Sequence, residues 1–275
     1  MIVLINGRRT RRLDIADRGL QYGDGLFETV AVARGVPLLW PAHLQRLQHG
    51  CARLGIDPPD PAVVRAEADQ LCAGRERAVL KIIVTRGLSG CGYLVASDAT
   101  PTRVLSLAPW PDRPAQQAHT GVAVCWCRTA LARQPRLAGL KHLNRLEQVL
   151  ARAEWAAEYA EGLMRDTEGY VIEGTMSNLF LVARGVLHTP ELSQSGVAGV
   201  MRAQVLDRAR AAGIEWRETW LKPAELESAD EIFLTNSLIG VWPVRSLSSR
   251  EYAIGPITQT IQKALAAAGC VTLAR

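Results

Sequence analysis

Lys141 is the residue whose type and setting first suggest chemistry. Of the 32 lysines and arginines in the chain, only four are lysines: Lys81, Lys141, Lys222 and Lys263. Lys141 is followed by apolar residues at helical spacing, which predict a helix over about 142–161 with a buried stripe: Leu143, Leu146, Leu150 and Ala153. An amine at the first turn of a helix has a lowered pKa and is a better nucleophile or base. The alternative is an ordinary solvated lysine.

A carboxylate and two turns rich in small residues could complete a binding site. Glu173 ends an apolar strand before the turn Gly-Thr-Met-Ser, where it could hold a cationic partner or form a simple salt bridge. In the segment 195–206, small residues precede a helix whose first amides could bind an anion. A further turn, Thr235-Asn236-Ser237, follows an apolar strand and offers more donors. Each of these features alone is weak evidence for function.

Together, these features meet the needs of pyridoxal 5'-phosphate (PLP). This cofactor needs a lysine for a Schiff base, an acidic group beside the pyridine nitrogen, and backbone amides around the phosphate. An arginine usually completes the phosphate site, and Arg46, in a helix predicted at 41–55, is the candidate. The sequence therefore predicts a PLP site.

The elements that must position these residues form two predicted α+β domains. The stretch 109–119 has three prolines and few large apolar residues, so we place a linker at 111–120 between domains at 1–110 and 121–275. Besides the helix after Lys141, helices are predicted at 41–55, 61–73, 200–212 and 256–268. Strands are predicted at 2–6, 26–40 (two strands around Arg34-Gly35), 78–87, 103–110, 121–127, 163–166, 170–173, 178–183, 186–189, 214–219, 231–235 and 241–245.

The composition argues against several other classes of protein. With 48% hydrophobic and 21% charged residues, the chain resembles an ordinary soluble globular protein. Neither a secretory signal nor a membrane-spanning run is evident, so we expect a cytoplasmic protein without a membrane partner. The six cysteines form no CxxC pair and no metal-binding spacing, which favours reduced thiols and no metal. The net charge of +5 is spread along the chain, which argues against a nucleic-acid partner.

Four motifs in order resemble the fold-type IV PLP enzymes, a family that includes branched-chain and D-amino-acid aminotransferases and the deoxychorismate lyases. The motifs span essentially the whole chain: ADRGLQYGDGLFETV (16–30), HLQRL (43–47), EGTMSNLFLV (173–182) and GVAGVMR (196–202). The resemblance implies a smaller N-terminal α/β domain, a larger C-terminal β-rich domain with helices, a small-molecule substrate and a homodimer.

The residues around the lysine, LAGLKHLNRLEQVLAR (137–152), are most similar to the lyase branch of this family. That branch converts 4-amino-4-deoxychorismate to 4-aminobenzoate and pyruvate in folate biosynthesis. By resemblance, Lys141 is the Schiff-base lysine and general base, and Glu173 is the partner of the pyridine nitrogen. The remaining cofactor-binding residues implied by the motifs are Arg46, Asn178, Asn236 and the amides of Val200 and Met201.

One departure from the lyase pattern affects substrate recognition. Cys91 stands where the resemblance implies an arginine, which leaves Arg86 as the candidate anchor for a substrate carboxylate. Two rival functions stay open. One is an aminotransferase acting on D- or branched-chain amino acids, and the other is a binding protein that kept the fold without the chemistry.

Overall fold

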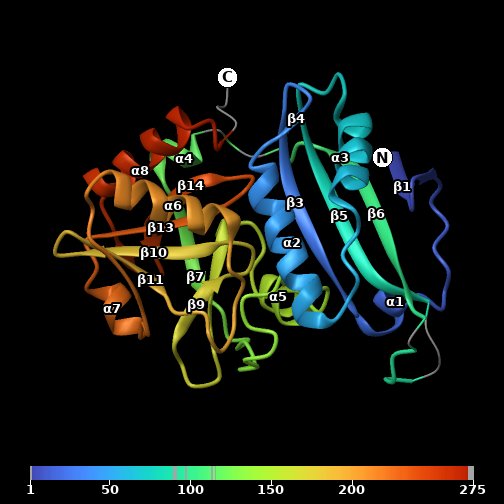
Figure 1. The fold of residues 1–275 in the computed structure, drawn as a ribbon. Coiled ribbons are helices and arrows are strands. Elements are labelled where there is room, and N and C mark those ends of the chain that lie inside the picture. The colour runs from blue at the N-terminus through green and yellow to red at the C-terminus, as the bar shows by residue number, and fades with distance from the viewer. Residues whose placement is uncertain (1, 89–91, 97, 113, 115, 272–275) are drawn as a thin grey trace. The chain divides into compact units, whose positions relative to one another are not determined.

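The computed structural model describes residues 2–88, 92–96, 98–112, 114 and 116–271. They divide into two compact units. The first unit runs to Pro111 and also includes Leu140–Asn144, and the second comprises Asp112–Gly139 and the chain from Arg145 onward. Both units combine a sheet with helices (Figure 1), which confirms the α+β class expected from the sequence.

The first unit is built on an antiparallel sheet with the order β2-β1-β6-β5-β3-β4. Two tight turns, Asn6-Gly7 and Arg34-Gly35, join neighbouring strands, and all four residues have positive φ. Such turns match the twist of a hairpin, which is why both could be predicted from the sequence. The strands are β1 (Ile2–Ile5), β2 (Arg8–Arg9), β3 (Gly25–Ala33), β4 (Val36–Pro37), β5 (Arg77–Leu88) and β6 (Thr100–Pro109).

The helices of the first unit are α1 (Arg18–Tyr22), α2 (Trp40–Leu54) and α3 (Pro61–Cys72). Helix α2 lies along β3 (Figure 1), has Pro41 in its first turn and ends at Gly55 with φ of 64°. A proline at the start and a left-handed glycine at the end are strong local boundaries. The helices predicted at 41–55 and 61–73 are therefore confirmed.

The second unit contains a mixed sheet that closes on itself. In its described residues the order is β12-β11-β10-β13-β14-β7-β8-β9, and β9 also pairs with β10 through Glu173 and Asn178. Strands β10, β13, β14, β7, β8 and β9 thus form a ring. The strands are β7 (Val122–Trp126), β8 (Glu161–Arg165), β9 (Val171–Gly174), β10 (Asn178–Ala183), β11 (Val186–Pro190), β12 (Trp216–Thr219), β13 (Glu231–Asn236), β14 (Gly240–Leu247) and β15 (Arg250–Glu251).

Apolar side chains from these strands fill the core of the second unit. Completely buried examples are Val124, Leu163, Leu179, Leu234 and Val244. The accompanying helices are α4 (Gln117–Thr120), α5 (Leu146–Arg152), α6 (Val200–Ala211), α7 (Pro223–Glu227) and α8 (Pro256–Ala267). Within the described ranges, none of the helices has the length and apolar character that crossing a membrane requires.

The helix predicted over 142–161 is wrong in both its length and its buried face. Helix α5 covers only Leu146–Arg152. Leu146, Val149 and Leu150 are 75%, 60% and 60% exposed, whereas Gln148 and Ala151 are buried. The residues before α5 are extended, because their backbone groups pair with β3 instead of forming a helical turn.

Candidate active site

Lys141 lies on an extended segment that pairs with β3. The Phe27 amide donates to the Lys141 carbonyl at 2.9 Å, and the Leu143 amide donates to the Gly25 carbonyl at 3.0 Å. The Lys141 side chain reaches over the Phe27 ring, with Nζ 4.4 Å from the ring centroid. Because α5 begins only at Leu146, Lys141 is not in the first turn of a helix, and the predicted dipole effect on its amine does not apply. The aromatic ring instead stabilises the charged form of the amine.

Arg46, on α2, is held by a buried carboxylate of β3. Its Nε donates to Glu28 Oε1 at 2.8 Å and its Nη2 to Glu28 Oε2 at 2.5 Å. His43 Nδ1 lies 2.6 Å from the same Oε2, and the side chains of Glu28 and His43 are each 1% exposed. Sequence reasoning selected Arg46 but missed Glu28, although a glutamate in the middle of an apolar strand was a visible signal.

The protonation states in this network follow from burial and charge. Burial alone would raise the pKa of the Glu28 carboxyl, but the charge of Arg46 and hydrogen bonds from His43 and Arg46 outweigh it and lower the pKa. Burial lowers the pKa of His43, with help from the charges of Arg46 and Lys141 and against the opposing effect of Glu28. The neutral imidazole therefore donates its Nδ1 proton to the Glu28 carboxylate.

Arg86 is engaged by groups of its own unit. Its Nε and Nη2 donate to both carboxylate oxygens of Asp24, at 2.7 and 3.0 Å. Its Nη1 and Nη2 also donate to the carbonyls of Gly55 and Leu54. With four of its five N–H bonds used in this way, Arg86 ties the end of α2 to β5, and its role as an anchor for a substrate carboxylate stays a prediction. Cys91, the other residue in that prediction, lies outside the described residues.

In the second unit, Glu173 and Asn178 hold one residue, Val197, between them. Glu173, 4% exposed, accepts a hydrogen bond from the Val197 amide through Oε2 at 2.9 Å. Asn178, opposite Glu173 in the β9–β10 pair, donates through Nδ2 to the Val197 carbonyl at 2.8 Å. The strand pair that closes the ring thus fixes the segment leading into α6. The cofactor role that the motif implied for Asn178 stays a prediction.

The start of α6 is an uncapped helix terminus. Gly199 is the N-cap and offers no side chain, so the amides of Val200 and Met201 have no side-chain cap. A Cβ atom on Gly199 would lie 1.9 Å from Asn178 Oδ1, so only glycine fits beside Asn178. The first amides of a helix and its positive end attract anions.

Asn236 connects the turn after β13 with the turn after β9. Its Oδ1 accepts hydrogen bonds from the Leu238 and Ile239 amides, and its Nδ2 donates to the Met176 carbonyl at 3.0 Å. The turn after β9 is itself held by Glu161, a buried residue of β8 that sequence reasoning did not select. Its carboxylate accepts hydrogen bonds from the amides of Gly162, Thr175 and Met176 and from the hydroxyls of Thr175 and Ser177.

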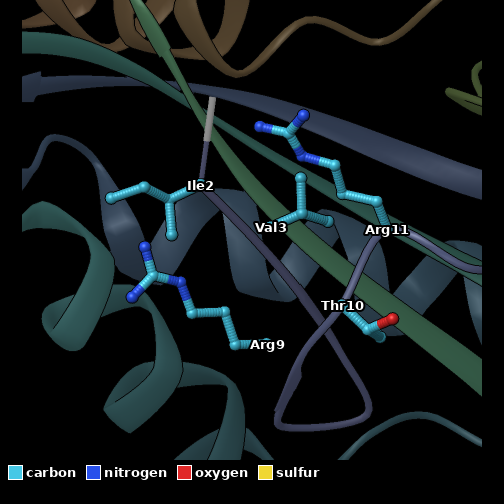
Figure 2. Close-up of a pocket in the computed structure, with 5 residues that line it drawn as sticks. All are labelled: Ile2, Val3, Arg9, Thr10 and Arg11. Carbon is cyan, nitrogen blue, oxygen red and sulfur yellow. The ribbon is translucent and has the colours of Figure 1, made fainter.

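The structure therefore forms two sets of predicted residues, one in each unit. Lys141 and Arg46 both contact neighbouring residues of β3 in the first unit. In the second unit, Glu173, Asn178 and the start of α6 meet at Val197, and Asn236 joins through Met176. A hollow of about 220 Å³ elsewhere in the first unit contains none of them (Figure 2); it is lined by Ile2, Val3, Arg9, Thr10 and Arg11.

Comparison with known proteins identifies the family. The sequence model of the amino-transferase class IV family matches residues 25–247. The chain belongs to this family. It is 37% identical over 263 residues to aminodeoxychorismate lyase of Vibrio harveyi, covering 94% of this chain and 97% of that protein. It is 30% identical over 277 residues to D-alanine aminotransferase of Bacillus licheniformis, covering 96% of each.

Solved structures of class IV proteins agree with this assignment. The crystal structure of 4-amino-4-deoxychorismate lyase from Pseudomonas aeruginosa superposes with a TM-score of 0.93 at 50% sequence identity, covering 96% of this chain and 98% of that chain. Branched-chain aminotransferase of Escherichia coli, at 24% identity and a TM-score of 0.86, shares the fold. The predicted fold-type IV architecture is thus confirmed.

Proposed function

We propose that this protein is a PLP-dependent aminodeoxychorismate lyase, which converts 4-amino-4-deoxychorismate to 4-aminobenzoate and pyruvate in folate biosynthesis. The observation that carries the proposal is the 50% identity, over nearly the whole of both chains, to a solved lyase of that name. The 37% identity to a second lyase supports it. The aminotransferases compared above are less similar.

The residues present fit the cofactor. A pyridinium nitrogen needs a carboxylate, and Glu173 is buried and held by the Val197 amide. A phosphate needs amide or cationic donors. The start of α6 offers such amides in the second unit, and Arg46 is the cationic candidate of the first unit. Asn178 holds the segment before α6, and Asn236 holds the turn after β9. Lys141 is the amine for the Schiff base. The lack of space for a side chain at Gly199 supports a phosphate-binding helix start that is already formed in the second unit.

The proposed mechanism assigns proton transfer to Lys141. When bound, PLP supplies an aldehyde for the substrate amine and a ring that accepts an electron pair. The Lys141 amine removes the proton from C4 of the substrate, and Glu173 keeps a proton on the pyridine nitrogen. The C–O bond of the neighbouring enolpyruvyl ether then breaks, and the departing group takes up a proton to become pyruvate. The remaining ring becomes aromatic, which drives the elimination.

The direct test is an assay of the purified protein with enzymatically generated aminodeoxychorismate, followed by the fluorescence of 4-aminobenzoate. We expect sustained product formation, a near-visible absorbance band from bound PLP, and loss of both in Lys141→Ala. Full turnover by Lys141→Ala would overturn the assignment of the lysine. Absence of product from a PLP-loaded protein would overturn the lyase assignment.

An aminotransferase is the second candidate, because D-alanine aminotransferase is 30% identical over nearly the whole chain. Incubation with D-alanine or leucine plus 2-oxoglutarate separates the two functions. Sustained glutamate formation without 4-aminobenzoate production would favour the aminotransferase. A colourless protein from which borohydride traps no adduct would favour a binding protein without the chemistry.

We also propose a homodimer in the cytoplasm. The three large apolar residues exposed on α5, namely Leu146, Val149 and Leu150, support association with a second copy of the chain. Light scattering on the wild type should give the mass of a dimer, and Val149→Asp should shift it toward the monomer. The five described cysteines are unpaired thiols, which supports a reducing compartment. We propose no nucleic-acid or membrane partner.

A further inference from the structure

Glu28 has contacts that the proposed mechanism does not use. It lies on β3, is 1% exposed, and accepts hydrogen bonds from Arg46 and His43. The preceding residue, Phe27, is the aromatic contact of Lys141. A buried carboxylate is costly unless it is paired and hydrogen-bonded. Glu28 is both, and its partner is the arginine assigned to the phosphate.

The geometry of the pair determines which edge of the Arg46 guanidinium contacts Glu28. A guanidinium has two edges that can form a pair of parallel hydrogen bonds, and Glu28 occupies the edge formed by Nε and Nη2. The other edge, formed by Nη1 and Nη2, therefore faces away from Glu28. A bidentate pair fixes the plane of the guanidinium as well as its position, so Glu28 determines the direction of that second edge.

His43 makes the arrangement more rigid. Its ring is as buried as Glu28, and its Nδ1 lies 2.6 Å from Glu28 Oε2. Because α2 carries His43 and Arg46 three residues apart, both side chains project from the same face of the helix toward β3. The carboxylate therefore has one partner on each of two consecutive helical turns and cannot rotate without breaking contacts to both.

We propose that Glu28 is a positioning residue that presents Arg46 to the phosphate of the cofactor, an inference that rests on the proposed function. Glu28 does not touch the cofactor. It acts through the orientation of Arg46, so its contribution depends on the phosphate and not on the pyridine ring or the aldehyde.

The test compares PLP with pyridoxal, which has no phosphate, by fluorescence titration of the apoprotein. We expect Glu28→Gln to weaken PLP binding by about tenfold or more, since a charge-assisted pair is lost, and to change pyridoxal binding less than twofold. In an Arg46→Ala background, Glu28→Gln should have no further effect on PLP affinity. Equal weakening of both ligands, or of neither, would overturn the proposal.

A matched control is available in the same unit. Glu67 accepts from Nε and Nη2 of Arg103 at 2.7 and 2.6 Å, a pair of the same geometry that involves no predicted site residue. Glu67→Gln should leave the ratio of PLP to pyridoxal affinity unchanged, and a change equal to that of Glu28→Gln would count against a specific role for Glu28. If Glu28→Gln does not fold, Glu28→Asp replaces it and should reduce the same ratio to a smaller extent.

The result also separates this proposal from the proposed function. Failure of the wild-type apoprotein to bind PLP would overturn both. The other outcome has two parts: the wild type forms 4-aminobenzoate normally, and Glu28→Gln keeps the wild-type preference for PLP over pyridoxal. This outcome would overturn only the role of Glu28.

Discussion

Lys141 Nζ lies 4.4 Å from the centroid of the Phe27 ring, and the backbones of the same two residues are joined by a hydrogen bond. A cation over an aromatic ring gains roughly 0.5–1 kcal/mol at a partly exposed site. Phe27→Leu removes that gain and should speed the reaction of Lys141 in the apoprotein with an amine reagent at pH 7.5 by about two- to fivefold. Site-resolved mass spectrometry gives the rate.

Two comparisons make this prediction specific. Phe27→Tyr keeps the ring and should leave the rate unchanged. Lys222, whose Nζ lies 3.4 Å from the Tyr170 ring centroid, is an internal control that should react at its wild-type rate in both variants. A Phe27→Leu protein whose Lys141 reacts no faster would contradict a stabilising role for the ring.

The stability of the protein in acid should depend on Glu28. Despite burial, the charge of Arg46 and the hydrogen bonds from His43 and Arg46 lower its pKa in the folded state below the ordinary value of 4.5. The contribution of Glu28 is therefore fully present above pH 4.5 and is lost as the pH falls through the lowered folded value. The difference in unfolding free energy between wild type and Glu28→Gln, measured in urea, should shrink from pH 7 to pH 3. A difference that is constant over this range is incompatible with the assignment.

Four of the five described cysteines should be unreactive in the native protein. Burial raises the pKa of Cys51, Cys72 and Cys125 to about 11, and burial with nearby negative charge raises that of Cys127 to about 12. At pH 8 only about one thiol in a thousand is then ionised. In a Cys91→Ser background, an aromatic disulfide reagent should label these four residues only after denaturant is added. Rapid labelling of any of these cysteines in the native protein would contradict the burial of that thiol.

Gly199→Ala should disturb the start of α6. The new Cβ would lie 1.9 Å from Asn178 Oδ1, so Asn178 must move and lose its hydrogen bond to the Val197 carbonyl. We expect a loss of about 1–3 kcal/mol in unfolding free energy and weaker retention of PLP on dialysis.

Gly213→Ala, at the other end of the same helix, is the matched control. Gly213 has φ of 70°, and no atom of the described residues lies within 4 Å of the position that a Cβ would occupy. Alanine there costs about 1 kcal/mol of backbone strain without a clash. PLP retention should be unchanged in this control. Equal retention by the two variants would argue against a cofactor role for the α6 terminus.

Much of the fold could be predicted because its boundaries are set by local residues. The hairpin at Asn6-Gly7, the first turn of α2 with Pro41, and the C-cap of α2 at Gly55 depend on backbone conformations that these residue types favour by themselves. The motif around Glu173 was also visible, since a carboxylate at the end of an apolar strand is unusual. These signals do not require knowledge of distant parts of the chain.

The sequence was least informative where distant partners decide the structure. The segment at Lys141 is extended because it pairs with β3, more than a hundred residues earlier, whereas its apolar spacing favours a helix. Arg86 is engaged by Asp24 and by the end of α2, and neither contact leaves a trace in the sequence around Arg86. Glu161 was missed because donors from the turn after β9, distant in sequence, give it a role.

The grouping of Leu140–Asn144 with the first unit has a consequence for synthesis and for gene dissection. A fragment ending near residue 111 would leave the Gly25 carbonyl and the Phe27 amide without their strand partners, an open edge prone to intermolecular pairing. During synthesis, the first unit cannot be completed until residues 140–144 have been made, after the last strand of its sheet, β6. The lysine is thus encoded within the stretch of the second unit and folds with the first, so a gene fragment that ends at residue 111 does not carry the complete first unit.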